Sequence, residues 1–227
     1  MKLLAIETAT DSCSVALWHN GEVREHFEAA ERRQTERVLP MVEALLAEAG
    51  WRLTDLDAIG FGHGPGAFTG VRVAVSVAQG LGFAADLPLI GVSTLAATAH
   101  AAAAQYGDGD WLIAFDARMN ELYLAGYRCD QGRLEVLLED CLAAPAALPL
   151  LPVGNAAGWR GAGSGALHLA AVREAWPMLG DWHAELLPHA SSVAALAVQQ
   201  HAQGAGVAAE LARPVYLRDR VIQGAIR

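Results

Sequence analysis

Cysteine and positive charge are both scarce in this chain of 227 residues. The three cysteines, Cys13, Cys129 and Cys141, are too few and too irregularly spaced for a disulfide framework or a paired metal motif, which indicates a reducing compartment. There are 16 Lys and Arg against 25 Asp and Glu, so the formal net charge is -9. Because clustered Lys and Arg supply most of the affinity for nucleic-acid phosphates, this balance argues against a chain that grips nucleic acid unaided. Any work on nucleic acid should therefore need a partner.

A targeting signal and a membrane span are missing as well. Glu7 follows Met1 before an apolar segment of signal-peptide length has accumulated, so no export signal is visible and the cytoplasm is expected. Residues 87–107 carry no Asp, Glu, Lys or Arg, over about the length that crosses a bilayer. Polar side chains interrupt this segment, and it is better interpreted as a short strand, Leu87–Val92, followed by a buried Ala-rich helix. No membrane association is expected.

Hydrophobic patterning is what the chain has in abundance. With 53% hydrophobic residues it is compact rather than disordered, and its length fits one large domain or two small lobes. The first half predicts three antiparallel strands, with the turn His19-Asn20-Gly21 joining the second to the third, and then alternates helices with strands. The expected order is βββαβαβα, with strands Leu3–Glu7, Ser12–Trp18, Glu22–Glu28, Leu56–Gly62 and Leu87–Val92 and helices 35–49, 68–84 and 95–105.

The second half repeats this beginning about 110 residues later. Trp111–Asp116 repeats the apolar strand that ends in a carboxylate at Glu7, and Gln131-Gly132 repeats the turn at Asn20-Gly21. The copy then degrades, and we expect a reduced second lobe, with the lobes at 1–106 and 107–227. The degraded part comprises a Pro-rich run, Ala144–Pro152, a Gly-rich segment, Gly154–Gly165, and two apolar helices near 166–176 and 190–203.

Two βββαβα units, each with an acidic residue at the end of its first strand, are typical of the two-lobed actin-like (ASKHA) architecture, an α/β fold found in actin, Hsp70 and sugar kinases. In that architecture the two carboxylates face each other across the interlobe cleft and orient water and Mg around nucleotide phosphates. Here they would be Glu7 and Asp116. The alternative, that both are merely exposed residues at strand ends, fits the spacing equally well.

The segments that follow these carboxylates are poorly suited to phosphate. Gly or small hydroxyl residues are needed there so that backbone N–H groups can close on the phosphates. Thr8-Ala9-Thr10 keeps the hydroxyl groups but lacks Gly, and the long side chains of Arg118 and Met119 would fill the place of a phosphate. We therefore interpret the cleft as degenerate, with no bound cofactor and no productive ATP hydrolysis by this chain alone.

Other catalytic or nucleotide motifs are weak or absent. The Gly-rich turn over residues 60–70 is not a Walker loop, because no Lys follows at the required spacing. Gly62, Gly64 and Ala67 match a dinucleotide fingerprint, but three antiparallel strands at the start argue against a Rossmann unit. No His pair has the spacing of helical metal ligands, and Ser164 lacks the flanking glycines of a nucleophile elbow. Neither a metal site nor a self-sufficient active site is expected.

Two helices of the first half carry more apolar and small surface than one sheet should cover. Helix 35–49 has an apolar stripe about 160° wide, whereas about 100° is usual for a helix that faces a core. Around helix 68–84 small residues recur at every fourth position, which lets another backbone approach closely: Gly66, Gly70, Ala74, Ala78 and Gly82. We expect a protein–protein interface here; the alternative is that the small residues pack against the protein's own core.

Several segments together resemble the TsaB family of bacterial tRNA threonylcarbamoyladenosine biosynthesis proteins, which are YeaZ-like and also known as glycoprotease homologues. The resemblance runs from end to end of the chain, and the GPGxFTGxR block at 64–72 is highly specific. The matching segments are Leu3–Thr10, Cys13–Leu17, Val38–Val42, Gly64–Arg72, Gly91–Thr94, Asp116–Arg118 with Glu121 and Tyr123, and Pro214–Arg218.

The resemblance implies a two-lobed actin-like protein without a catalytic role of its own, a pseudoenzyme that forms a homodimer through the helices of its first lobe when alone. It implies a partnership with TsaD, the metal- and nucleotide-binding subunit, and with the ATPase TsaE. Together they support transfer of threonylcarbamoyl from its adenylate to the adenosine 3′ to the anticodon in tRNAs that read ANN codons. The chain itself would hold no metal and no cofactor, and would meet tRNA only through the complex.

By the same analogy, the partner interface would comprise the outer face of helix 35–49 and the helix after Phe68, with Arg72 beside it; the alternative for Arg72 is a solvated residue at a helix start. Three departures from the family pattern put only the polar contacts of those positions in doubt: Gln34-Thr35 where His-Ser is common, Ala67 where Ser is common, and Gln223 where an aromatic is usual. The expected interface residues are Val38, Met41, Val42, Leu45, Gly66, Phe68, Gly70, Arg72, Ala74, Ala78 and Gly82.

Two other functions stay open. A small-molecule kinase or ATPase with a divergent cleft would rest on Glu7 and Asp116, and the isolated chain would then bind Mg–ATP tightly. A metallopeptidase is supported only by the older family name, and purified protein would then hold stoichiometric metal.

Overall fold

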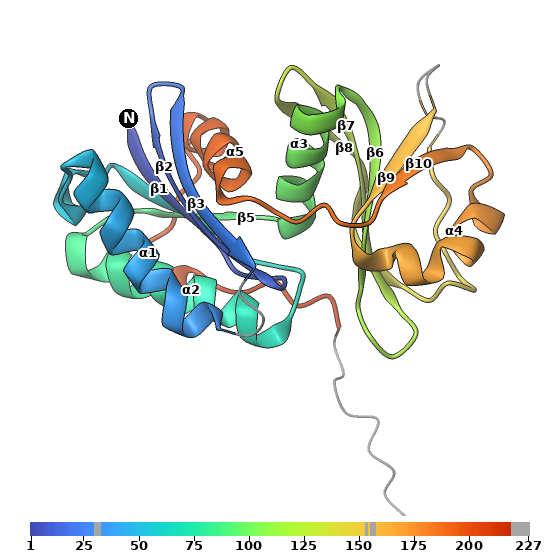
Figure 1. Ribbon diagram of the computed structural model, residues 1–227, viewed down its shortest axis with the longest axis horizontal. Helices are drawn as coiled ribbons and strands as arrows, with labels where there is room; N and C mark the ends of the chain where they lie inside the picture. Colours follow the sequence, from blue (N-terminus) through green and yellow to red (C-terminus); the bar gives the residue numbers. More distant parts are fainter. Residues whose placement is uncertain (30–32, 153, 155–157, 219–227) are drawn as a thin grey trace, which may run out of the picture.

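The fold consists of two five-stranded sheets with the same strand order (Figure 1). The computed structural model describes residues 1–29, 33–152, 154 and 158–218. The first sheet has the order β3-β2-β1-β4-β5, and the second, β8-β7-β6-β9-β10, repeats it strand for strand. This duplication confirms the predicted two-lobed actin-like α/β fold. The strands are β1 (Lys2–Glu7), β2 (Ser12–His19), β3 (Glu22–Ala29), β4 (Ala58–Gly62), β5 (Leu89–Val92), β6 (Gly109–Asp116), β7 (Leu122–Asp130), β8 (Arg133–Ala143), β9 (Trp159–Ala162) and β10 (Leu179–His183).

Each sheet opens with an antiparallel meander whose second turn the sequence predicted. In the first meander Asn20 and Gly21 have φ angles of 51° and 93°, and in the second Gln131 and Gly132 have 47° and 74°. Two successive positive φ angles are required by the tight hairpin turn that matches the twist of antiparallel strands. The last two strands of each sheet then add in parallel, with β4 beside β1 and β9 beside β6.

The helices form layers around the two sheets. In Figure 1, α1 and α2 lie side by side on one face of the first sheet, α3 and α5 lie between the sheets, and α4 covers the far side of the second sheet. The helices are α1 (Gln34–Ala49), α2 (Phe68–Ala85), α3 (Thr94–Tyr106), α4 (Leu169–Ala175) and α5 (Ala190–Ala202), with short 3₁₀ turns at Leu53–Asp55, Ser164–His168 and Ala209–Leu211.

Each half of the chain lends its last helix to the sheet of the other half. Leu95, Ala99 and Ala102 of α3 pack with Trp111 and other residues of the second sheet. In the same way α5, the last described α-helix of the second half, packs its alanines and Val193 against the first sheet. The lobe boundary predicted between residues 106 and 107 falls between α3 and β6 along the chain and stays a prediction. Each sheet is covered by a helix that comes from the other half of the chain.

The second lobe is reduced in its helices and complete in its sheet. Residues 144–158, which connect β8 to β9, hold no helix in their described part, whereas the equivalent connection in the first lobe holds α1. The sequence predicted neither β9 nor β10, and this is a correction. Both strands are short, and each contains a glycine, Gly161 or Gly180, that weakens the strand pattern.

The small-residue ridge on α2 faces the protein's own first sheet. A Cβ atom on Gly70 would lie 2.0 Å from the carbonyl oxygen of Thr8, and one on Gly66 would lie 2.4 Å from that of Ala9. Ala74 and Ala78 are fully buried, and a Cβ on Gly82 would overlap Leu89. The ridge therefore lets α2 lie close to its own sheet, and the prediction that Gly66, Gly70, Ala74, Ala78 and Gly82 form an intermolecular contact is corrected accordingly.

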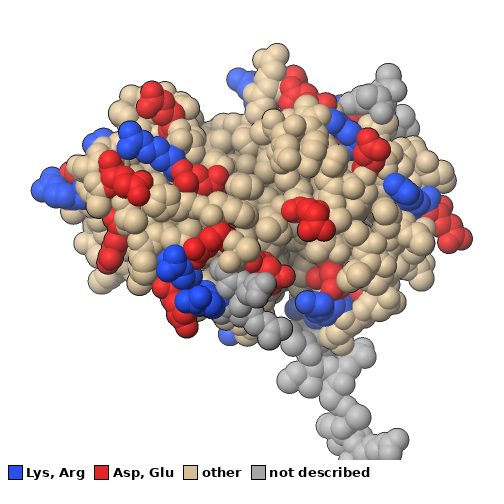
Figure 2. All heavy atoms as spheres, in the orientation of Figure 1, with Lys and Arg blue, Asp and Glu red and all other residues tan. Residues whose placement is uncertain are grey.

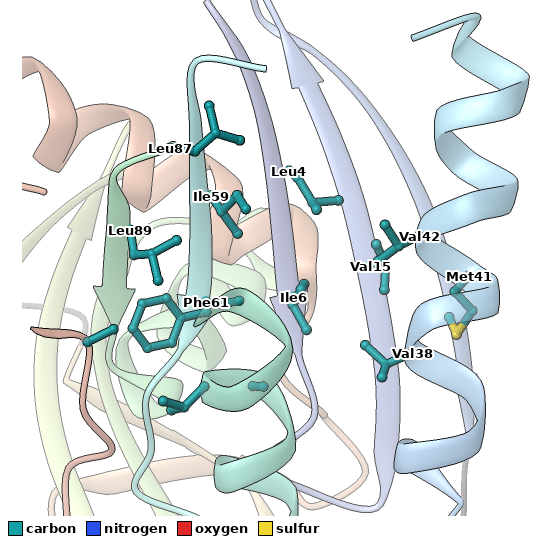
Figure 3. Close-up of a cluster of buried hydrophobic side chains, with 14 of the residues drawn as sticks. Leu4, Ile6, Val15, Val38, Met41, Val42, Ile59, Phe61, Leu87 and Leu89 are labelled. Atoms are coloured by element: carbon teal, nitrogen blue, oxygen red, sulfur yellow. The ribbon is translucent and has the colours of Figure 1, made fainter. Parts of the chain in front are cut away.

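The apolar stripe of α1 is likewise buried in the core of the first lobe. Val38 and Val42 point from α1 toward Val15 on β2 (Figure 3), and Met41 and Leu45 are buried in the same cluster. These four residues are therefore core residues rather than interface residues. The stripe was wide because Leu39, which is exposed, widens it beyond the core-facing side.

Among the described residues, one helix, α2, has the length and composition to cross a membrane. A single such helix is weak evidence, because core helices of soluble proteins meet the same criterion. Here the Val71, Ala74 and Val75 face of α2 lies in the first core. Residues 87–107 form β5 and α3, as the sequence predicted.

Candidate functional site

A cleft of about 900 Å³ lies between the two lobes. Its lining comes from the loop after β1, the start of α2, the turn after β6 and the C-terminal segment Pro214–Arg218, here called the strap. The volume is in the range of small-molecule sites, and most of the lining is apolar. The cleft is therefore where the duplicated fold would place a ligand.

Glu7 is buried beneath the cleft instead of lining it. Its carboxylate accepts hydrogen bonds from the backbone N–H of Ala9 at 2.7 Å and from the Thr94 hydroxyl at 3.1 Å. Gly62 approaches so closely that a Cβ atom there would overlap the carboxylate. Burial raises the pKa of Glu7 to about 7, although these hydrogen bonds oppose the shift. The prediction that Glu7 faces Asp116 across the cleft is therefore wrong for Glu7.

The loop that would close on phosphate is tied to α1 and α2. The Thr8 hydroxyl donates to the Gly70 carbonyl at 2.7 Å, and the Ala67 N–H donates to the Ala9 carbonyl at 2.7 Å. Gln34 donates from its side-chain amide to the Thr10 carbonyl at 2.8 Å, so this departure from the family pattern keeps a polar contact. Ala67, in contrast, caps α2 without a side-chain hydrogen bond, and Gln223 lies outside the described residues.

Asp116 does line the cleft, but its carboxylate interacts with Arg118 in the turn that follows β6. One oxygen accepts from the Arg118 backbone N–H at 2.8 Å, and the other lies 3.1 Å from the Arg118 guanidinium. Arg118, Met119 and Asn120 are three successive residues with φ between 55° and 63°. Left-handed backbone costs about 1–2 kcal/mol per residue for side chains other than Gly. The turn therefore needs support from elsewhere in the structure.

The strap supplies that support through Arg218. Its guanidinium donates to the Ala117 carbonyl at 3.1 Å and to the Arg118 carbonyl at 3.4 Å, and it pairs with the carboxylate of Glu121. The same guanidinium contacts the Met119 sulfur at 3.1 Å. Arg218 thus holds the left-handed turn from the side of the cleft.

The strap is equally well attached to the first lobe. The Val215 N–H donates to the His63 carbonyl at 2.8 Å. The Tyr216 ring stacks on Phe68 at a centroid distance of 5.8 Å, and its hydroxyl accepts from Arg72 Nε at 2.7 Å. A five-residue segment therefore crosses the mouth of the cleft with one end on each lobe.

Charge around the cleft is mixed rather than cationic. Asp11, Asp116, Arg72, Arg118 and Arg218 all line it. Figure 2 shows acidic and basic side chains interspersed over the face that it presents, without a patch of one sign. Among the described residues no group of three His, Cys, Asp or Glu side chains is arranged to hold a metal ion. The arrangement suits recognition of single charged groups better than a polyanion.

Of the residues predicted from the sequence, the structure brings Gly66, Phe68, Arg72 and Asp116 to the cleft. Sequence reasoning missed the parts played by Tyr216 and Arg218, although both lie in a segment that carried the resemblance. Tyr216 and Arg72 are 144 residues apart, and no spacing rule joins positions so distant. Only the fold brings these side chains together.

Comparison with known proteins gives consistent matches to a family model, to a curated relative and to solved structures. The family model described as TsaD, tRNA N6-adenosine threonylcarbamoyltransferase, matches residues 26–172. A relative from Escherichia coli (strain K12), named tRNA threonylcarbamoyladenosine biosynthesis protein TsaB, is 42% identical over 229 residues, which cover 97% of this chain and 96% of the relative.

Two solved structures from Pseudomonas aeruginosa match the whole fold. One, described as an uncharacterized protein with similarity to peptidase YEAZ, is 44% identical with a TM-score of 0.88, and the match covers 96% of this chain and 99% of that one. The other, described as YeaZ, is 42% identical with a TM-score of 0.87, and the match covers 95% and 99%.

Proposed function

The chain belongs to the TsaB family of tRNA threonylcarbamoyladenosine biosynthesis proteins, and from this premise we propose that it is the noncatalytic partner subunit of a TsaD-containing complex. With the ATPase TsaE, that complex would place threonylcarbamoyl on the adenosine 3′ to the anticodon of tRNAs that read ANN codons. The chain would work in the cytoplasm without a membrane, a metal or a cofactor of its own, and would meet tRNA only through the complex.

The cleft carries the proposal that this subunit is noncatalytic. Glu7, the first of the two carboxylates that an active member of the fold would use, is buried and hydrogen-bonded beneath the cleft. The second, Asp116, is paired with Arg118. The chain nevertheless matches the TsaD family model over residues 26–172, so it is built on the same domain as that transferase. Because both carboxylates of this transferase-type domain already interact with groups of the chain itself, the domain is better suited to be a partner of the enzyme than a second enzyme.

The outer face of α1 and α2 is the surface that we propose for TsaD. Once the buried residues are removed from the predicted interface, exposed apolar side chains still lie on the solvent side of both helices. Phe83 of α2 is 82% exposed and Leu39 of α1 is 45% exposed. These two side chains define the outer face, whereas Val73 and Val77 of α2 are partly buried against the first core. Exposed aromatic and aliphatic side chains on adjoining helices are typical of interaction sites.

Alone, the chain would form a homodimer through this outer face, so that self-association and partner binding compete. Light-scattering mass on a sizing column, with the chain alone and mixed with a TsaD-type subunit, tests both. We expect the dimer alone and a mixed complex on addition of the partner.

Phe83→Asp is expected to abolish both associations, because it buries a charge in an apolar contact. Leu150→Asp is the matched control, since Leu150 is 94% exposed in the second lobe and should tolerate the charge in every assay. Equal melting temperatures would show that both variants fold. A Phe83→Asp chain that still dimerises and still binds the partner would place the interface elsewhere.

A further inference from the structure

Arg72 is a cation with an unusual environment at the mouth of the cleft. It lies on the first turn and a half of α2, its side chain is exposed, and within the described part of the chain no carboxylate lies within ion-pair distance of it. The other two arginines of the cleft differ in this respect, because Arg118 pairs with Asp116 and Arg218 pairs with Glu121. Among the described residues, Arg72 is thus the cleft arginine whose positive charge is available to pair with a ligand.

The guanidinium of Arg72 is also held in one orientation. Its central carbon lies 3.5 Å from the centroid of the Phe68 ring and 5.7 Å from that of Tyr216. Its Nε donates to the Tyr216 hydroxyl at 2.7 Å, which leaves the two terminal nitrogens as donors. A planar guanidinium fixed on an aromatic face is preorganised for the two parallel hydrogen bonds that a carboxylate or a phosphate accepts.

The surroundings favour a protein ligand over a nucleic acid. Phe68, Tyr216, Met119 and Leu167 are exposed apolar side chains that line the same cleft. Aromatic residues, Met and Arg are enriched in protein–protein interfaces, and Arg and Tyr recur among the residues that dominate binding energy. A phosphate backbone would instead meet Asp11 and Asp116 beside a single unpaired arginine, on a chain whose net charge is -9.

We propose that Arg72, oriented by Phe68 and Tyr216, donates hydrogen bonds to a carboxylate side chain that the partner protein inserts at the mouth of the cleft, with apolar neighbours of that carboxylate against Met119 and Leu167. The inference rests on the proposed function, because the partner is the TsaD-type subunit. It adds a second contact, at the cleft, to the outer face of α1 and α2, and it gives the strap a role in recognition: Tyr216 is a positioning residue that acts through Arg72.

The test is the dissociation constant of the full chain with the TsaD-type subunit, measured by titration calorimetry at low and at physiological salt. Arg72→Gln should weaken binding by about tenfold or more, since it leaves the partner carboxylate without its counter-charge. Arg72→Lys should recover only part of this loss, because an ammonium group cannot form the two parallel bonds. Tyr216→Phe keeps the ring stack and removes only the hydroxyl, so it should cause a smaller loss.

Arg173→Gln is the matched control, because Arg173 is an exposed arginine on α4 of the second lobe whose side chain donates to the Gly180 carbonyl. It should bind like the wild type, and the salt dependence of binding should flatten in Arg72→Gln alone. Binding of Arg72→Gln within twofold of the wild type overturns this inference and leaves the proposed function standing. Loss of tRNA retention by the complex with unchanged partner binding would assign Arg72 to a phosphate and also overturn it. If the wild-type chain does not bind the partner at all, the proposed function falls and this inference with it.

Discussion

At the scale of single residues, Glu7 has a structural environment at a position where the sequence pattern predicted a cleft carboxylate. The carboxylate is fully buried and accepts hydrogen bonds from Ala9 and Thr94 of the same lobe. Burial outweighs these bonds and raises the pKa of Glu7 to about 7 from its ordinary value of 4.5. The group is therefore part of the buried interior of the first lobe, and its protonation is linked to folding.

This linkage predicts a pH dependence of stability. Because the folded state binds the Glu7 proton more tightly than the unfolded state, the contribution of Glu7 is fully present below about pH 4.5 and is lost as the pH rises through about 7. The loss amounts to about 3 kcal/mol at most. Glu7→Gln should remove this decline and be more stable than the wild type at pH 8, as measured by urea unfolding between pH 5 and pH 8.

Glu43→Gln, on the exposed side of α1, should keep the wild-type decline and serves as the control. A decline that persists unchanged in Glu7→Gln would show that another group is responsible.

At the scale of elements, α2 shows what a periodic pattern can and cannot predict. Small residues at every fourth position indicate that one side of the helix makes a close approach, and the structure has that approach at Gly70, whose neighbour is the Thr8 carbonyl. The pattern does not say whether the other surface belongs to the same chain. Exposed positions of the same helix, such as Gly80 and Phe83, lie on the opposite side.

The two glycines of α2 give a direct test of which side faces the core. Gly70→Ala should destabilise the fold by about 2 kcal/mol or more, because the new methyl group would overlap the Thr8 carbonyl. Gly80→Ala meets nothing within 4 Å and should stabilise by about 0.5–1 kcal/mol through the lower entropy of the unfolded chain. Urea unfolding measures both. A Gly70→Ala chain that keeps its stability but loses partner binding would show instead that the small residues of α2 contact the partner.

Most elements of the first half were predictable because each satisfies a local rule. The Asn20-Gly21 turn, the buried runs of β1 and β4 and the period of α1 need no information from elsewhere in the chain. The second half was less predictable because β9 and β10 depend on tertiary contacts. β9 is four residues long, and it is defined by parallel pairing with β6 and by the approach of the Trp182 ring to Gly161.

The residues of the candidate site likewise divide into those that local sequence signals could identify and those that only tertiary contacts bring together. Asp116 and Arg72 could be found from motif and resemblance, and both do line the cleft. The strap could not be found, because the bonds of Arg218 to the turn at Ala117 and Arg118 join positions about a hundred residues apart. Whether a carboxylate faces a cleft or lies beneath it, as Glu7 does, depends on side-chain packing that the sequence pattern does not contain.

At the scale of the whole molecule, the exchange of α3 and α5 and the strap tie the two lobes together. Each sheet is covered by a helix that follows the other sheet, and the strap bonds to His63 in one lobe and to the turn at Ala117 in the other. We infer a chain that offers its partner two surfaces at once: the outer face of α1 and α2, and the mouth of the cleft at Arg72. This is the organisation expected of a subunit that recognises and positions another protein.

The measurement that tests this conclusion most directly is threonylcarbamoyl transfer to tRNA in a mixture of purified TsaD-type and TsaE-type proteins, with and without this chain. We predict no transfer by the chain alone and transfer by the mixture only when the chain is present, with Phe83→Asp failing to support it and Leu150→Asp supporting it fully. Equal transfer with and without the chain, or transfer by the chain alone, would contradict its role as a noncatalytic partner.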